Sequence, residues 1–208
     1  APIDALYAAA EANEWAVAAA QARSLGQCVP SMNQALQAVR VAYSEEASPE
    51  LRALEREARL RSVPFLWDDD AVSLGYGRFS ATWPRDALPA LHEISWDDLR
   101  SIPVVLITGT NGKTTTARLV ARMLQESGHQ VGNSSTDGIH INGELVDSGD
   151  WTGPGAARAI LRHSEVDAAV LETARGGILR RGLGVTGCHG ALVTNISSDH
   201  LGEYGVFD

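Results

Sequence analysis

Apolar residues recur at helical spacing through the first 60 residues of the chain. They do so over 3–23, an alanine-rich stretch, and again over 31–43, so each stretch is predicted to be a helix. A third helix is expected to begin with Ser48 as its N-cap and Pro49 in its first turn, and to end before Pro64. The amino-terminal part is therefore predicted to be rich in helix.

Short apolar runs and prolines follow these helices. Residues 65–67 and 72–76 are predicted strands, and the aspartates between them predict a turn. Residues 83–103 contain Pro84, Pro89 and Pro103, which indicates a linker; within it, Ser95 and Asp98 are spaced as a capping box for one helical turn. We expect a domain boundary near residue 100.

The second half of the chain alternates between strand and helix patterns. Apolar, β-branched runs predict buried strands, Asn142-Gly143 between alternating residues predicts a hairpin, and helices are expected between the strands. The predicted strands are 104–108, one starting at Val131, the hairpin 139–146, 168–171 and 191–194, and the helices are 113–127 and 155–163. This alternation predicts an α/β fold with a parallel sheet flanked by helices over 101–208, preceded by a small helix-rich α/β domain over 1–100.

Composition and charge narrow the classes of function. The chain is 44% hydrophobic with a net charge of −9, which argues against a long basic surface for nucleic acid. No apolar run approaches the roughly 18 residues of a membrane helix, so no membrane partner is expected. Cys28 and Cys188 fit no metal or redox spacing and are expected to be free thiols in the cytoplasm. Of the 17 basic residues, only Lys113 is a lysine.

That lysine lies in a glycine-rich loop between a predicted buried strand and a predicted helix. Backbone N–H groups of such a loop can point at a phosphate, Lys113 adds a full positive charge, and Thr114 offers a hydroxyl to Mg²⁺. The alternative is a plain strand-to-helix turn, which has no need for this lysine. Ile107 departs from the general pattern, which has glycine at that position. The predicted ATP phosphate-binding residues are Gly109, Thr110, Asn111, Gly112, Lys113, Thr114 and Thr115.

The loop resembles the ATP loop of the Mur ligase family, and four later segments agree: the first three resemble its cyanophycin synthetase-like branch, and the last resembles the Asn-x-x-x-Asp-His-Leu stretch of the family. The four segments are 135–139, 153–154, 171–180 and 195–201, and the resemblance runs from about 95 to 207. Residues 44–82 bear a weaker likeness to the stretch that precedes the ATP-grasp module of cyanophycin synthetase. A linker stands where that module would follow, so the resemblance is to a stand-alone Mur-type ligase that lacks it.

The resemblance implies an ATP-dependent ligase that joins an amino acid to a carboxylate through an acyl phosphate. It assigns catalytic roles to Lys113, Glu172 and His200, and metal binding to Thr114, Glu172 and His200, with ATP and Mg²⁺ as cofactors. Taken alone, Glu172 could equally be a solvated acid at a strand end, and a lone histidine is more often structural. A P-loop phosphotransferase or NTPase, and a non-catalytic nucleotide-binding module, are the alternative functions.

The acceptor carboxylate, a small molecule or a peptide, is expected to bind near Thr136, Asp137, Thr152 and Arg175. Trp151 either stacks on the substrate or covers an apolar patch. The family also has a carbamylated lysine and a C-terminal domain beyond the stretch seen here, so we expect this chain alone to be inactive in the complete ligation. The oligomeric state is left open.

Overall fold

The computed structural model describes residues 3–198 of the chain. The contacts divide the chain into two compact units, Ala1–Glu57 with Ala90–Glu93, and Ala58–Pro89 with Ile94–Asp208. The boundary that we expect near residue 100 stays a prediction. No helix in the described range is long and apolar enough to cross a membrane, and the cytoplasmic location also stays a prediction.

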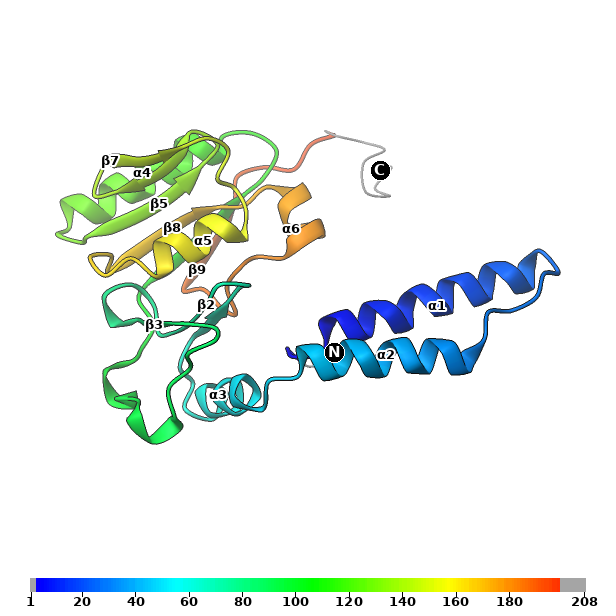
Figure 1. The fold of residues 1–208 in the computed structure, drawn as a ribbon. Coiled ribbons are helices and arrows are strands. Elements are labelled where there is room, and N and C mark those ends of the chain that lie inside the picture. Colours follow the sequence, from blue (N-terminus) through cyan, green and yellow to red (C-terminus); the bar gives the residue numbers. More distant parts are fainter. Residues whose placement is uncertain (1–2, 199–208) are drawn as a thin grey trace. The chain divides into compact units, whose positions relative to one another are not determined.

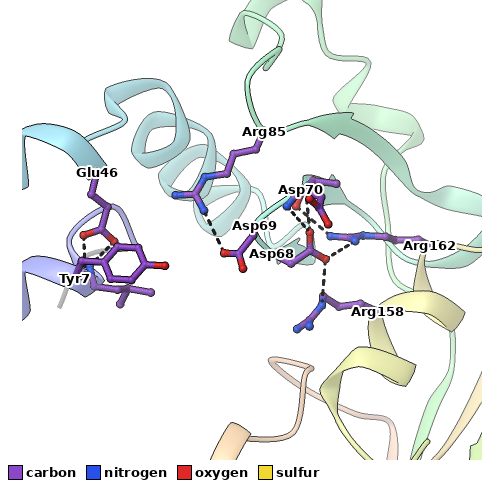
Figure 2. A network of polar contacts seen from close by, with 10 residues as sticks. Tyr7, Glu46, Asp68, Asp69, Asp70, Arg85, Arg158 and Arg162 are labelled. Atoms are coloured by element: carbon purple, nitrogen blue, oxygen red, sulfur yellow. Dashed lines mark hydrogen bonds and ion pairs between the residues drawn. The ribbon is translucent and has the colours of Figure 1, made fainter. Parts of the chain in front are cut away.

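The first unit contains the three predicted helices, α1 (Leu6–Ser24), α2 (Met32–Glu46) and the start of α3 (Pro49–Leu60). Ser48 accepts a hydrogen bond from the Leu51 N–H at 3.3 Å, which confirms it as the N-cap of α3. The prediction that the first helix starts at residue 3 is wrong, because α1 begins at Leu6. The Glu46 carboxylate accepts the N–H groups of Leu6 and Tyr7 at 2.6 and 2.8 Å and so caps α1 from another helix (Figure 2).

A small antiparallel sheet opens the second unit, in the order β1 (Phe65–Trp67), β2 (Ala71–Leu74) and β3 (Ala81–Pro84). The third strand overlaps the segment that we predicted to be a linker. The edge position explains this, because a proline at the end of an edge strand costs no ladder hydrogen bond. The predicted capping box is wrong in detail: Trp96–Asp98 forms a short 3-10 turn, but the Ser95 side chain accepts no cap hydrogen bond.

The main sheet has six strands in the order β7-β6-β5-β8-β4-β9. Its strands are β4 (Val104–Thr108), β5 (Val131–Ser135), β6 (Gly138–Ile141), β7 (Glu144–Ser148), β8 (Ala168–Glu172) and β9 (Gly190–Val193). The pairs β5·β8, β8·β4 and β4·β9 are parallel, as predicted. The predicted hairpin is the antiparallel pair β6·β7, which turns at Asn142 and Gly143, both at positive φ.

Helices cover both faces of this sheet (Figure 1). They are α4 (Lys113–Glu126) and α5 (Pro154–Leu161), while the short α6 (Arg175–Arg181) follows the carboxyl end of β8. Alternate residues of β8 separate two layers of the core: Ala169 and Leu171 pack in the cluster that contains α5, and Ala168 and Val170 pack in the cluster that contains α4. The predicted α/β fold, a mostly parallel sheet flanked by helices, is therefore confirmed.

An ionic network joins the small sheet to α5 (Figure 2). Asp68 follows β1, and its Oδ2 accepts from Arg162 Nη1 at 2.6 Å and pairs with Arg158 Nε at 3.2 Å. Arg162 also donates to Ser73 Oγ at 2.7 Å and to the Ala71 carbonyl at 3.1 Å. Both arginines lie at the carboxyl-terminal end of α5, so this network fixes that end of the helix against β1 and β2.

Candidate functional site

The predicted phosphate loop spans four residues between β4, which ends at Thr108, and α4, which begins at Lys113. Ile107 is fully buried in β4, in register with Glu172 and Leu192 on the two flanking strands. A glycine at this position would leave a cavity in the core, which explains the departure from the general loop pattern. Because Gly112 offers no side chain as a cap, the first N–H groups of α4 have no such acceptor.

The carboxyl end of β9 holds the loop in place. Asn195 bonds to it three times: its carbonyl accepts the Thr110 N–H at 3.0 Å, and its side-chain amide accepts from and donates to the Asn111 backbone at 3.0 and 2.9 Å. Thr194 Oγ1 donates to the Asn111 carbonyl at 2.6 Å. Gly109 has φ +132°, and a Cβ there would lie 2.2 Å from Thr194 Oγ1. This close approach explains why glycine stands at that position.

A cavity of about 750 Å³ opens at the carboxyl ends of β4, β8 and β9. Ligands bind in this region of open α/β sheets. Among the predicted site residues, it is lined by Gly109, Thr110, Lys113, Thr152 and Arg175. Lys113 Nζ donates to the Thr110 carbonyl at 3.0 Å, so the ammonium lies folded over its own loop.

The carboxylate of Glu172 lies at the end of β8 beside the start of α4. Glu172 is 1% exposed, and neither carboxylate oxygen has a hydrogen-bond partner among residues 3–198. Burial raises the pKa of Glu172 above its ordinary value of 4.5, and the charge of Asp150 acts in the same direction. The Thr114 hydroxyl, the Thr136 backbone and the charge of Lys113 lower this pKa, but less than burial raises it.

This arrangement fits a divalent cation. A buried carboxylate with no protein donor requires a counter-charge, and the Thr114 hydroxyl lies close enough to influence it. Oxygen atoms from carboxylate and hydroxyl groups are the ligands that Mg²⁺ prefers. Glu172 and Thr114 are therefore the described residues that could hold Mg²⁺. His200, the third predicted metal ligand, lies outside the described residues.

The predicted acceptor residues divide into two groups. Thr152 and Arg175 line the cavity, and Thr152 Oγ1 donates to Asp150 Oδ1 at 2.8 Å. Thr136 and Asp137 lie beyond that lining, on the turn after β5: Thr136 Oγ1 is 3.0 Å from Thr114 Oγ1, and Asp137 forms an ion pair with Arg118 of α4.

The comparisons with known proteins bear on the half of the chain that contains this site. Residues 107–208 match the model of the Mur ligase middle domain. These residues belong to the Mur ligase family. Within this family the chain is similar to the cyanophycin synthetase of Trichormus variabilis, with 48% identity over 121 residues, and to that of Synechocystis, with 54% identity over 101 residues. It is also 34% identical over 134 residues to the UDP-N-acetylmuramoyl-L-alanyl-D-glutamate--2,6-diaminopimelate ligase of Parabacteroides distasonis.

These relatives are much longer than the stretch that matches. The matched segment makes up 57% of this chain but 13% of the Trichormus cyanophycin synthetase, and 60% of this chain but 27% of the Parabacteroides ligase. The matches therefore identify a Mur ligase middle domain, and the activity of a whole ligase is a matter for proposal.

Three residues at this cavity and its loop were not among the predicted site residues. Asp150 lines the cavity and influences Glu172, while Asn195 and Thr194 hold the phosphate loop. Two signals were available in the sequence. Asp150 directly precedes the loop that contains the predicted site residue Thr152, and Asn195 directly follows a predicted buried strand. Trp151 packs against the core cluster of α5, which confirms that it covers an apolar patch. It also lines the cavity, and its stacking on a substrate stays a prediction.

Proposed function

We propose that this chain is the ATP-binding part of an ATP-dependent ligase that joins an amino acid to a carboxylate through an acyl phosphate. The observation that carries the proposal is the phosphate loop, whose lysine borders a 750 Å³ cavity at the sheet's carboxyl edge. The buried acid Glu172 and the match to the Mur ligase middle domain support the same function. The substrates are an amino acid and a carboxylate acceptor, as the family's chemistry implies.

The proposed role of the loop is to bind and orient the phosphates of ATP. Backbone N–H groups at the start of α4 and the Lys113 ammonium place positive charge where phosphate oxygens gather negative charge. To do so, Lys113 must exchange its hydrogen bond to the Thr110 carbonyl for one to phosphate. Mg²⁺, held by Thr114 and Glu172, supplies further charge neutralisation when it is bound.

The acceptor carboxylate is proposed to lie in the cavity between Thr152 and Arg175. A guanidinium can bind a carboxylate through two parallel hydrogen bonds, which orients it for attack. The attacking carboxylate oxygen forms a bond to the γ-phosphorus of ATP, and ADP leaves. An amine nitrogen then forms the amide bond, and inorganic phosphate leaves with the electron pair of the broken C–O bond.

A trapping experiment tests the first of these steps without the second substrate. Hydroxylamine stands in for the amine and converts an acyl phosphate into a hydroxamate, which mass spectrometry detects. Amino acids and short acidic peptides are screened as acceptors with ATP and Mg²⁺. The expected result is ADP release that requires an acceptor and is matched by hydroxamate. ADP release without an acceptor and without hydroxamate would refute the ligase proposal and favour an NTPase.

A further inference from the structure

The turn between β5 and β6 lies against the start of α4, beside the buried acid of the site. It consists of Thr136 and Asp137, which are both exposed. Thr136 Oγ1 is 3.0 Å from Thr114 Oγ1, and the Thr136 backbone lies close enough to Glu172 to lower its pKa. The turn therefore contacts both of the groups that could hold Mg²⁺, the hydroxyl of Thr114 and the carboxylate of Glu172.

A second contact, an ion pair, joins the same turn to α4. Arg118 Nη2 lies 2.5 Å from Asp137 Oδ2. Residues four apart on a helix lie on the same face, so Arg118 is the neighbour of Thr114 one turn further along α4. Two adjacent residues of the turn are thus held by two neighbouring positions on one face of the helix.

The strand that precedes the turn anchors the backbone of Asp137. The Asp137 N–H donates to Ser135 Oγ at 3.2 Å, and Ser135 is fully buried at the end of β5. Ser135 is also paired with Gly138 across the hairpin, so both ends of the turn belong to the sheet. With its backbone anchored in this way, Asp137 gives the guanidinium of Arg118 a fixed point on the turn.

This ion pair is too exposed to contribute much to the stability of the fold. The side chains of Arg118 and Asp137 are 57% and 48% exposed. Water screens such a pair, and it adds little to the free energy of unfolding. It can still determine the position of the turn, because the two turn residues are exposed and have little packing of their own.

We propose that Arg118 is a positioning residue for the magnesium site, because through Asp137 it keeps the turn against the Thr114 hydroxyl. The inference rests on the proposed function, in which Thr114 and Glu172 bind Mg²⁺. A site whose oxygen ligands are already in place loses less conformational freedom when the ion binds, so its affinity is higher. The proposal gives Asp137 this ordering role in place of the predicted contact with the acceptor.

A titration of the full chain with Mg²⁺ alone tests the proposal. Binding raises the unfolding temperature, and the dependence on Mg²⁺ concentration gives an apparent dissociation constant. Arg118→Gln should raise this constant about 3- to 5-fold, the effect of losing one exposed ion pair. The metal-free chain should change its unfolding temperature by no more than about 2 °C. Loss of a positive charge alone would favour Mg²⁺ binding, so weaker binding identifies a loss of positioning.

Arg122→Gln is the matched control for the loss of charge. Arg122 lies one turn beyond Arg118 on α4, is 72% exposed and pairs with Glu126 at 2.5 Å. The variant removes the same charge and the same kind of ion pair, but at a distance from the turn. It should not weaken Mg²⁺ binding, and a loss equal to that of Arg118→Gln would overturn the proposal.

A double-mutant cycle shows whether Arg118 acts through Asp137. Asp137→Asn should also weaken Mg²⁺ binding, and the chain with both changes should bind no more weakly than either single variant. Effects that add, or wild-type affinity in Arg118→Gln, would overturn the positioning role. Glu172→Gln separates this failure from that of the proposed function. If Mg²⁺ stabilises the wild type no more than Glu172→Gln, the magnesium site itself is refuted, and the positioning role with it.

Discussion

Replacing Asp68 with alanine should loosen the attachment of α5 to the small sheet. Asp68 accepts from the Asp70 and Ala71 N–H groups at 3.2 and 2.9 Å in addition to binding the two arginines of α5. Its side chain is 25% exposed, so water replaces these partners only in part. The opposite end of α5 contributes Gly155 and Ala156 to the cavity wall, so the loss should also reach the acceptor site.

The expected cost is about 3 kcal/mol in the free energy of unfolding. A hydrogen bond to a charged group contributes about 1.5–3 kcal/mol, and the truncation leaves Arg162 without its carboxylate partner. Asp68→Asn keeps an oxygen for the turn amides and should cost about half as much. Asp69→Ala is the matched control, because Asp69 is 94% exposed and pairs with Arg85 only at 4.0 Å; it should cost less than about 0.5 kcal/mol.

Urea unfolding at pH 7 measures these differences, and hydrogen exchange of the peptide 154–162 shows whether α5 is the part that loosens. Burial raises the pKa of Asp68, but the hydrogen bonds from Ala71, Arg162 and Asp70 and the charge of Arg162 together outweigh burial and lower the pKa below the ordinary 3.8. The stabilisation is therefore complete above pH 3.8 and lost as the pH falls through the lowered value. Equal losses for the variants at positions 68 and 69, or unchanged exchange in α5, would refute the reasoning.

Three further predictions concern the phosphate loop and its acid. Lys113→Met should lower the hydroxamate-forming rate by about 10³-fold or more, since the loop loses its full charge; a near-normal rate would contradict the proposed function. Gly109→Ala should destabilise the chain by about 1–3 kcal/mol in thermal unfolding, because its Cβ meets Thr194, whereas Gly112→Ala has no atom within 4 Å and should cost about 1 kcal/mol. Glu172→Gln should stabilise the metal-free chain and abolish stabilisation by Mg²⁺. Because the folded pKa of Glu172 is raised, the wild type should lose stability as the pH rises from 4.5 through that value, and the variant should lack this slope.

Local signals predicted the elements that local chemistry determines. The N-cap at Ser48, the turn at Asn142-Gly143 and the loop between β4 and α4 are each set by residues within a few positions of one another. The alternation of β-branched runs with helices was sufficient to predict the parallel strands. A strand that is buried on both faces of a sheet consists almost entirely of apolar residues, many of them β-branched.

Features that depend on distant partners were missed. The start of α1 is set by Glu46, about 40 residues away, and no local pattern contains that information. The strand β3 ends in proline, a residue that argues against strands unless the edge position is known. The roles of Asn195 and Thr194 depend on β9 lying beside β4, which is a matter of strand order and cannot be read from either strand alone.

The lysine of the phosphate loop makes the site chemically unique. Apart from Lys113 and the histidines, the basic residues of this chain are all arginines. The guanidinium of arginine does not react with mild acylating reagents at neutral pH. Lys113 Nζ is the one side-chain amine in the sequence, and it donates to the Thr110 carbonyl. An amine-directed label would therefore mark a single side-chain atom, and protection of that atom by a nucleotide would report occupancy of the loop without any assay of turnover.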